Sequence, residues 1–101
     1  GTAMRMSAES RKQHILSTSA ELCKKIEYRR LTKKMISERA KISKSLINYH
    51  FRSMGLLRTS LLSYACDKKI NHILAQGLVA KEPVVMRLPH IFKKRVLECL
   101  L

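Results

Sequence analysis

The side chains between residues 43 and 51 are of the types that hydrogen-bond to the edges of DNA bases. Lys44 can donate to O6 or N7 of guanine, and Asn48 can form a pair of hydrogen bonds with adenine. The hydroxyl groups of Ser43 and Ser45 suit either base. The segment therefore predicts recognition of double-stranded DNA, and each good pairing would discriminate between bases by about 1–3 kcal/mol.

The charge of the chain supports a polyanionic partner. Its 101 residues include 21 Lys and Arg against 7 Asp and Glu, a formal net charge of +14. Ten of the basic residues lie between Lys24 and Arg52, where the acidic residues are Glu27 and Glu38. A run of charge is often only a solvated helix face, but such faces usually mix both signs. The excess indicates a phosphate-binding surface, and with no Trp the composition does not favour a membrane surface.

Two short helices must position these side chains. Thr32 is placed to cap the first helix, with Leu31 packing on Ile36 as a hydrophobic staple. The same arrangement returns eleven residues later, with Ser43 as the cap. In the second helix, about 43–51, Ile42, either Leu46 or Ile47, and Phe51 can point inward while the polar residues face out. Two helices joined by so short a turn predict a helix-turn-helix.

The start of the first of these helices is also suited to a phosphate. Thr32 offers a hydroxyl and free backbone N–H groups at the positive end of the helix dipole. Lys33 and Lys34 add positive charge beside it. We therefore expect these residues to contact the DNA backbone.

The rest of the chain also reads as helical. It has three Gly and two Pro, and its apolar residues recur at helical spacing. The prediction is an all-α fold, in which a three-helix helix-turn-helix domain is followed by a longer fourth helix and a C-terminal helix. The first expected helix spans about residues 10–26, and the two short helices span 33–40 and 43–51. Ser53 caps the fourth helix, which continues through Leu74 and ends at Gly77. A turn at 81–83 and a last helix over 88–101 follow.

The domain organisation follows from these elements. Residues 1–6 are read as the remnant of an expression tag or a disordered start, 7–55 as the DNA-binding domain and 56–101 as C-terminal helices. The last helix has an apolar face that either covers the core or forms a homodimer. We expect a homodimer, because helix-turn-helix proteins commonly bind twofold half-sites. The residues of this face are Leu88, Ile91, Phe92, Val96, Leu97 and Leu100.

One stretch resembles a known family. The block Thr32-Lys-Lys-Met-Ile36-Ser-Glu-Arg-Ala40-Lys-Ile42-Ser43-Lys44-Ser-Leu-Ile47-Asn48-Tyr49-His50-Phe51, followed by Ser53 and Leu57, is similar to the helix-turn-helix of the tetracycline-repressor (TetR) family, and the similarity spans residues 10–62. It implies DNA contacts by Thr32, Lys44, Tyr49 and His50, with Tyr49 and His50 mainly on the phosphate backbone. A core aromatic is the alternative for Tyr49. Ser53 completes the predicted DNA-binding set.

The chain departs from the family pattern in ways that bear on specificity and ligands. Glu27 and Lys41 replace customary glycines, Asn48 replaces a tyrosine and Met54 replaces a lysine. These changes predict a different operator sequence. Family members normally continue with helices that hold an inducer pocket, whereas this chain offers about two more, so a small-molecule inducer is not expected. Two explanations of the short length stay open: the chain is a piece of a longer protein, or it is a naturally compact regulator.

The predicted function is that of a sequence-specific, DNA-binding transcription regulator, a repressor or an activator. The alternative is an architectural or accessory DNA-binding protein of plasmid or phage type. No enzyme is predicted, because nucleophile, phosphate-loop and paired-ligand motifs are missing. No metal site or cofactor is expected from the scattered His residues, and Cys23, Cys66 and Cys99 are expected to be buried thiols. The chain has no apolar run of spanning length, and a cytoplasmic location is expected.

Overall fold

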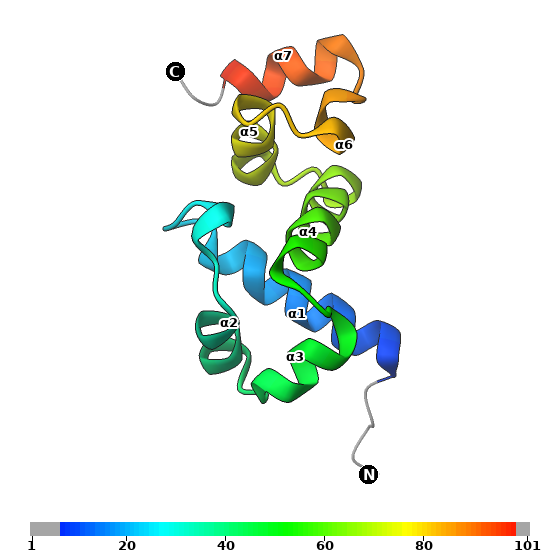
Figure 1. The fold of residues 1–101 in the computed structure, drawn as a ribbon. Coiled ribbons are helices and arrows are strands. Elements are labelled where there is room, and N and C mark those ends of the chain that lie inside the picture. The colour runs from blue at the N-terminus through cyan, green and yellow to red at the C-terminus, as the bar shows by residue number, and fades with distance from the viewer. Residues whose placement is uncertain (1–6, 99–101) are drawn as a thin grey trace, which may run out of the picture.

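The computed structural model describes residues 7–98, and its regular elements are all helical (Figure 1). The all-α prediction is confirmed. None of the helices within this range is both long and apolar enough to cross a membrane. The elements are α1 (Ala8–Leu22), the 3-10 turn η1 (Tyr28–Arg30), α2 (Lys33–Ala40), α3 (Lys44–His50), α4 (Met54–Lys68), α5 (Asn71–Val79), α6 (Pro83–Met86) and α7 (His90–Glu98).

The helices form an elongated molecule of 45 × 27 × 21 Å with different elements at its two ends. Helices α1 and α4 pack against each other in the middle, α2 and α3 lie at one end, and α5, α6 and α7 lie at the other (Figure 1). Helix α1 also packs on α2 and α3, while α4 packs on α5 and α6. The central pair therefore connects the two ends of the molecule.

Side-chain caps set the starts of the helices as the sequence predicts. Thr32, Ser43 and Ser53 each accept a hydrogen bond from the backbone N–H three residues ahead, at 3.1, 3.0 and 3.1 Å. A cap of this kind stabilises a helix by about 1 kcal/mol. Leu31 and Ile36, the predicted staple, are both buried. Helix α2 ends at Ala40, as expected.

Several predicted helix ends are wrong. Helix α1 ends at Leu22 and not near residue 26, and the chain then turns into η1. The predicted fourth helix is two helices, because Lys69 has a left-handed backbone (φ 57°) that ends α4. Gly77 lies buried inside α5 and ends nothing. The last helix starts at His90, after Pro89, rather than at residue 88.

One hydrophobic core runs through the described chain. It extends from Ile15 in α1 through Ile47 in α3 and Leu61 in α4 to Val96 in α7. Burial of each such side chain contributes about 1.5–3 kcal/mol. Because residues from every α-helix between α1 and α7 join this cluster, the two ends of the molecule share one core.

The η1 segment is tied to the far half of the chain. The Tyr28 side chain is buried, and its backbone N–H donates to Gln76 Oε1 of α5 at 2.7 Å. Its hydroxyl donates to Glu82 Oε1 at 3.1 Å. Burial raises the pKa of Tyr28 above its usual value, which keeps this hydroxyl a donor. The contacts fix the segment that leads into α2.

The turn between α2 and α3 depends on Lys41, which adopts a left-handed conformation (φ 59°, ψ 46°). A residue with a Cβ pays roughly 1–2 kcal/mol there, whereas glycine does not. We expect Lys41→Gly to raise the free energy of unfolding by up to about 1 kcal/mol in urea denaturation, since part of the relief is lost to a more flexible unfolded chain. Lys41→Ala is the control: an equal gain from alanine would assign the effect to the lysine charge.

The two described cysteines are free thiols. Cys23 is buried at the end of α1, and burial raises its pKa to about 12. Cys66 is half-buried in α4, where burial also raises its pKa. Neither thiol ionises readily, and Cys66 Sγ donates a weak hydrogen bond to the carbonyl oxygen of Val84 at 3.9 Å. Cys99 lies outside the described residues.

Candidate nucleic-acid interface

Helix α3 exposes its polar side chains at one end of the molecule. Ile47 is fully buried and Phe51, just after the helix, is nearly so. With these two anchors turned inward, Lys44 and Asn48 are exposed, together with Ser43 and Ser45. Because no other described helix lies beyond α3 at this end (Figure 1), this face is open to a large partner. The exposed face of α3 is therefore the candidate contact surface.

The angle between α2 and α3 is held by three contacts around the turn. Ser37 Oγ donates to the carbonyl oxygen of Ile42 at 2.6 Å, and the N–H of Ile42 donates back to the carbonyl of Ser37 at 3.2 Å. A ring nitrogen of His14 in α1 lies 3.1 Å from the carbonyl oxygen of Ala40. Sequence reasoning did not predict these roles for Ser37 and His14, since the contacts depend on how the chain folds back on α1.

The start of α2 presents a second set of polar groups. The Thr32 oxygen accepts the capping hydrogen bond, so its hydroxyl hydrogen remains available to donate to a phosphate oxygen. Lys34 is exposed beside it and Lys33 is half-buried. Arg58 of α4 holds the residues just before α2 in place. Its Nη2 donates to the carbonyl oxygens of Arg29 at 3.1 Å and Leu31 at 3.3 Å. No spacing pattern in the sequence singles out Arg58.

Tyr49 and His50 differ in their access to a partner. Tyr49 is 78% exposed, so the alternative interpretation as a core aromatic is wrong. Its ring meets that of His50 edge to face, with centroids 5.0 Å apart. His50 is half-buried, and its Nε2 is buried without a hydrogen-bond partner within residues 7–98. Tyr49 is therefore the more accessible of the two predicted contacts.

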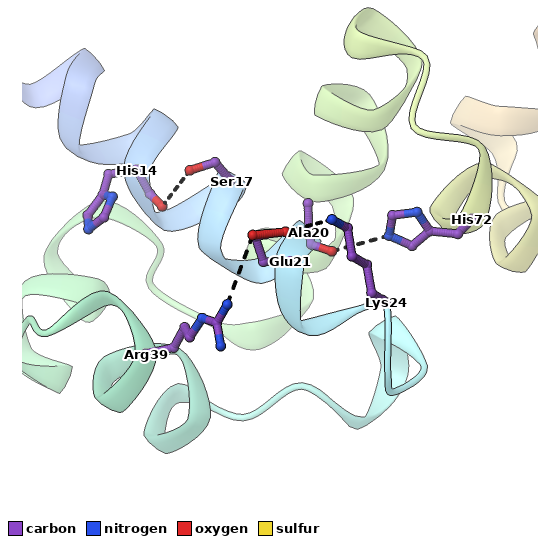
Figure 2. Close-up of polar contacts among 7 residues, drawn as sticks. All are labelled: His14, Ser17, Ala20, Glu21, Lys24, Arg39 and His72. Carbon is purple, nitrogen blue, oxygen red and sulfur yellow. Dashed lines mark hydrogen bonds and ion pairs between the residues drawn. The ribbon is translucent and has the colours of Figure 1, made fainter.

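Polar contacts on α1 orient the neighbouring helices (Figure 2). Glu21 lies 2.9 Å from Lys24 and 3.9 Å from Arg39 of α2. The hydrogen bond from Lys24 lowers the pKa of Glu21, so this carboxylate stays charged beside the two cations. On the other side, a ring nitrogen of His72 in α5 lies 3.2 Å from the carbonyl oxygen of Ala20. Arg39 therefore points back to the scaffold and not to the α3 face.

The predicted DNA-binding residues gather on three neighbouring elements. They occupy the start of α2, all of α3 and the residue that caps α4, and α3 packs on α2 and α1. Lys41 and Arg52 were not included in the prediction, yet both are exposed next to the two ends of α3. The signal that could have found them was the run of basic residues itself.

The predicted dimerisation face divides into two parts. Val96 is 1% exposed and belongs to the core, against which the half-buried Leu88 and Phe92 also pack. Ile91 is 66% exposed and Leu97 is 43% exposed. Leu100 lies outside the described residues. The described part of α7 therefore leaves two large apolar side chains for contact with another molecule.

Comparison with known families identifies the segment that carries this surface. The family model for bacterial regulatory proteins of the tetR family matches residues 15–58. These residues are a TetR-family helix-turn-helix DNA-binding domain. Within the TetR domain, α2 and α3 form the helix-turn-helix, and α1 and the first turns of α4 support it. No curated protein and no solved structure matches the chain.

The TetR domain belongs to a family of DNA-binding transcription regulators, and this agrees with the exposed face of α3. Residues 59–98, which include α5, α6 and α7, lie beyond the family match. Across residues 7–98, no group of three His, Cys, Asp or Glu side chains is arranged to hold a metal ion.

Proposed function

We propose that this protein is a sequence-specific transcription regulator that inserts α3 into the major groove of double-stranded DNA. The observation that carries the proposal is the orientation of α3, in which Ile47 is buried while Lys44 and Asn48 are exposed. An α-helix fits the major groove, where each base pair presents a distinct pattern of donors and acceptors. Such a regulator would act in the bacterial cytoplasm, where the chromosome lies.

The contacts divide by chemistry. Lys44, Asn48, Ser43 and Ser45 are assigned to base edges. Contacts with phosphate oxygens fix the register of the protein on the duplex and carry no sequence information. The residues assigned to phosphate are Thr32, Lys33, Lys34, Tyr49, His50 and Ser53, with Lys41 and Arg52 added for their exposed charge beside α3.

Selection of bound duplexes from a random-sequence library at moderate salt tests the proposal. The expected result is an enriched sequence that binds much more tightly than scrambled DNA of equal length. A specificity ratio of about 10³ or more is usual for such regulators. Tight, steeply salt-dependent binding without an enriched sequence would contradict the proposal.

That second result would favour the architectural or accessory alternative. The net charge of +14 on 101 residues supports this candidate, because phosphate neutralisation alone gives strong binding to any sequence. Such a protein would show a broad footprint and weak sequence preference. The same library experiment therefore separates the two functions.

We further propose that the protein binds DNA as a homodimer through α7. Ile91 is its most exposed apolar side chain, and it lies at the end of the molecule opposite α3. A twofold dimer would place two copies of α3 on half-sites about 34–36 Å apart, or a multiple of this spacing, and the selected sequence would be a palindrome.

Ile91→Glu should shift the protein from dimer to monomer in sedimentation experiments at micromolar concentration, because the change buries a charge in the contact. A point substitution is preferable to truncation near Gly77, which would cut through α5 and remove Val96 from the core. Leu56→Glu in α4, at a residue 55% exposed, is the matched control. An unchanged dimer in the Ile91 variant would place the contact elsewhere.

A further inference from the structure

A groove lies between α5, α6 and α7, at the end of the molecule away from α3. It has a volume of about 660 Å³ and an apolar base that includes Leu78, Met86 and Leu97. Met86 and Leu97 are 42% and 43% exposed, so the apolar base is accessible. The groove is outside the segment that matches the TetR family.

The rim of the groove is basic. Lys81, Lys93 and Lys94 line it, and Glu98 is the single acidic residue among the lining residues. The ammonium group of Lys93 donates to the carbonyl oxygen of Met86 at 3.0 Å, which holds this charge at the edge of the apolar base. The surface thus combines an apolar centre with a positive border.

The apolar centre and positive border of the groove limit which molecules can bind there. DNA presents mainly a charged phosphate backbone, which gains little from the apolar side chains at the bottom of the groove. The groove also lies at the other end of the molecule from α3. In a twofold contact through this groove the same patch would meet itself, so a second copy would bring the lysines of one rim towards those of the other. Ile91, where the dimer contact is proposed, is not among the residues that line the groove. An occupant with apolar residues on one side and carboxylates on its flanks complements both properties.

We propose that this groove binds an acidic amphipathic helix of a partner protein. Apolar side chains spaced three and four residues apart would enter between α5 and α7, as in other helix-in-groove complexes. Glutamates or aspartates beside them would pair with Lys81 and Lys94 at the rim. Helix α7 has nine residues and so is roughly 13 Å long, which matches two to three turns of a bound helix. The partner and DNA would bind at opposite ends of the molecule.

The test uses the full chain and a labelled synthetic peptide of about 18 residues, with leucines on one helical face and glutamates elsewhere. Binding is measured by fluorescence anisotropy. We expect Lys94→Glu and Leu97→Asn each to weaken binding at least about tenfold, because one repels the acidic flank and the other removes apolar contact. A peptide of the same composition in scrambled order should bind at least about tenfold more weakly as well.

Two matched variants control for charge and exposed apolar area. Lys25→Glu makes the same charge change beyond the end of α1, and Leu56→Asn alters an exposed leucine of α4. Both should bind the peptide like the original protein. Equal losses in the controls, equal binding of the scrambled peptide or no binding of the designed peptide would overturn the proposal.

Sedimentation of the same variants separates this partner from a second copy of the chain. Unchanged association of Lys94→Glu and Leu97→Asn is the expected result. Conversion of both to monomer, with peptide binding intact, would make the groove a contact between copies and overturn the proposal. Because the peptide assay needs no DNA, its failure would leave the assignment of α3 to DNA unaffected.

Discussion

Replacing Asn48 by alanine is expected to lower the ratio of specific to random DNA binding by roughly 5- to 150-fold, equivalent to about 1–3 kcal/mol. Asn48 is exposed on α3 whereas Ile47 is buried, so the Asn48 amide can reach a base edge without disturbing the core. The loss should appear at particular base pairs of the selected sequence. Titration of the selected duplex and of single-base variants measures it.

Lys33→Ala provides the contrast, because Lys33 lies at the start of α2 and is assigned to phosphate. It should weaken binding to selected and random DNA by similar factors and reduce the salt slope by about one unit. Lys44→Ala should resemble Asn48→Ala and relax the preference at other base pairs. Equal effects of all three variants on selected and random DNA would contradict the division into base and phosphate contacts.

Gly77→Ala is expected to lower the free energy of unfolding by roughly 1–3 kcal/mol, the usual cost of overpacking a core. An added Cβ would lie 2.7 Å from Cγ2 of Val85 and 3.1 Å from Cδ2 of Leu62. Alanine normally favours a helix interior over glycine by about 1 kcal/mol, so the contact must outweigh this gain. Urea denaturation gives the difference as a shift of midpoint.

Gly55→Ala in α4 is the matched control. The nearest neighbour of its added Cβ would be Ser53 Oγ at 3.6 Å, an ordinary contact. This variant should gain about 0.4–1 kcal/mol through the lower entropy of its unfolded chain. A stabilising Gly77→Ala would contradict this prediction. It would mean that α6 can move away from α5 at little cost, so that the tight packing of Val85 on Gly77 does not contribute to stability.

Local signals in the sequence were enough to predict the DNA-binding half of the fold. The caps Thr32, Ser43 and Ser53 act on the backbone three residues ahead, so their effect depends on neighbours in the chain. Helical spacing narrowed the inward position of α3 to Leu46 or Ile47, and Ile47 is the buried one. For the same reason the exposed face of α3 could be predicted before any tertiary contact was known.

Other features depend on contacts between distant segments. The break between α4 and α5 occurs at a left-handed lysine, Lys69, a residue type that gives no signal for this conformation. Arg58 and His14 bind carbonyl oxygens 27 and 26 residues away, and no pattern along the chain predicts such partners. The apolar spacing of α7 could not show that Val96 turns to the core while Leu97 does not.

The hydrogen bonds between η1 and the C-terminal half of the chain show that the end of the family match is not the end of the packed unit. The family match ends at residue 58, but the backbone N–H and hydroxyl of Tyr28 find their acceptors at Gln76 and Glu82. A peptide cut at the end of the match would lose both hydrogen bonds and the apolar cover that the later helices supply. The segment that matches the family is therefore smaller than the unit that shares one core and these hydrogen bonds. The helices outside the match therefore contribute to the stability of the matched segment.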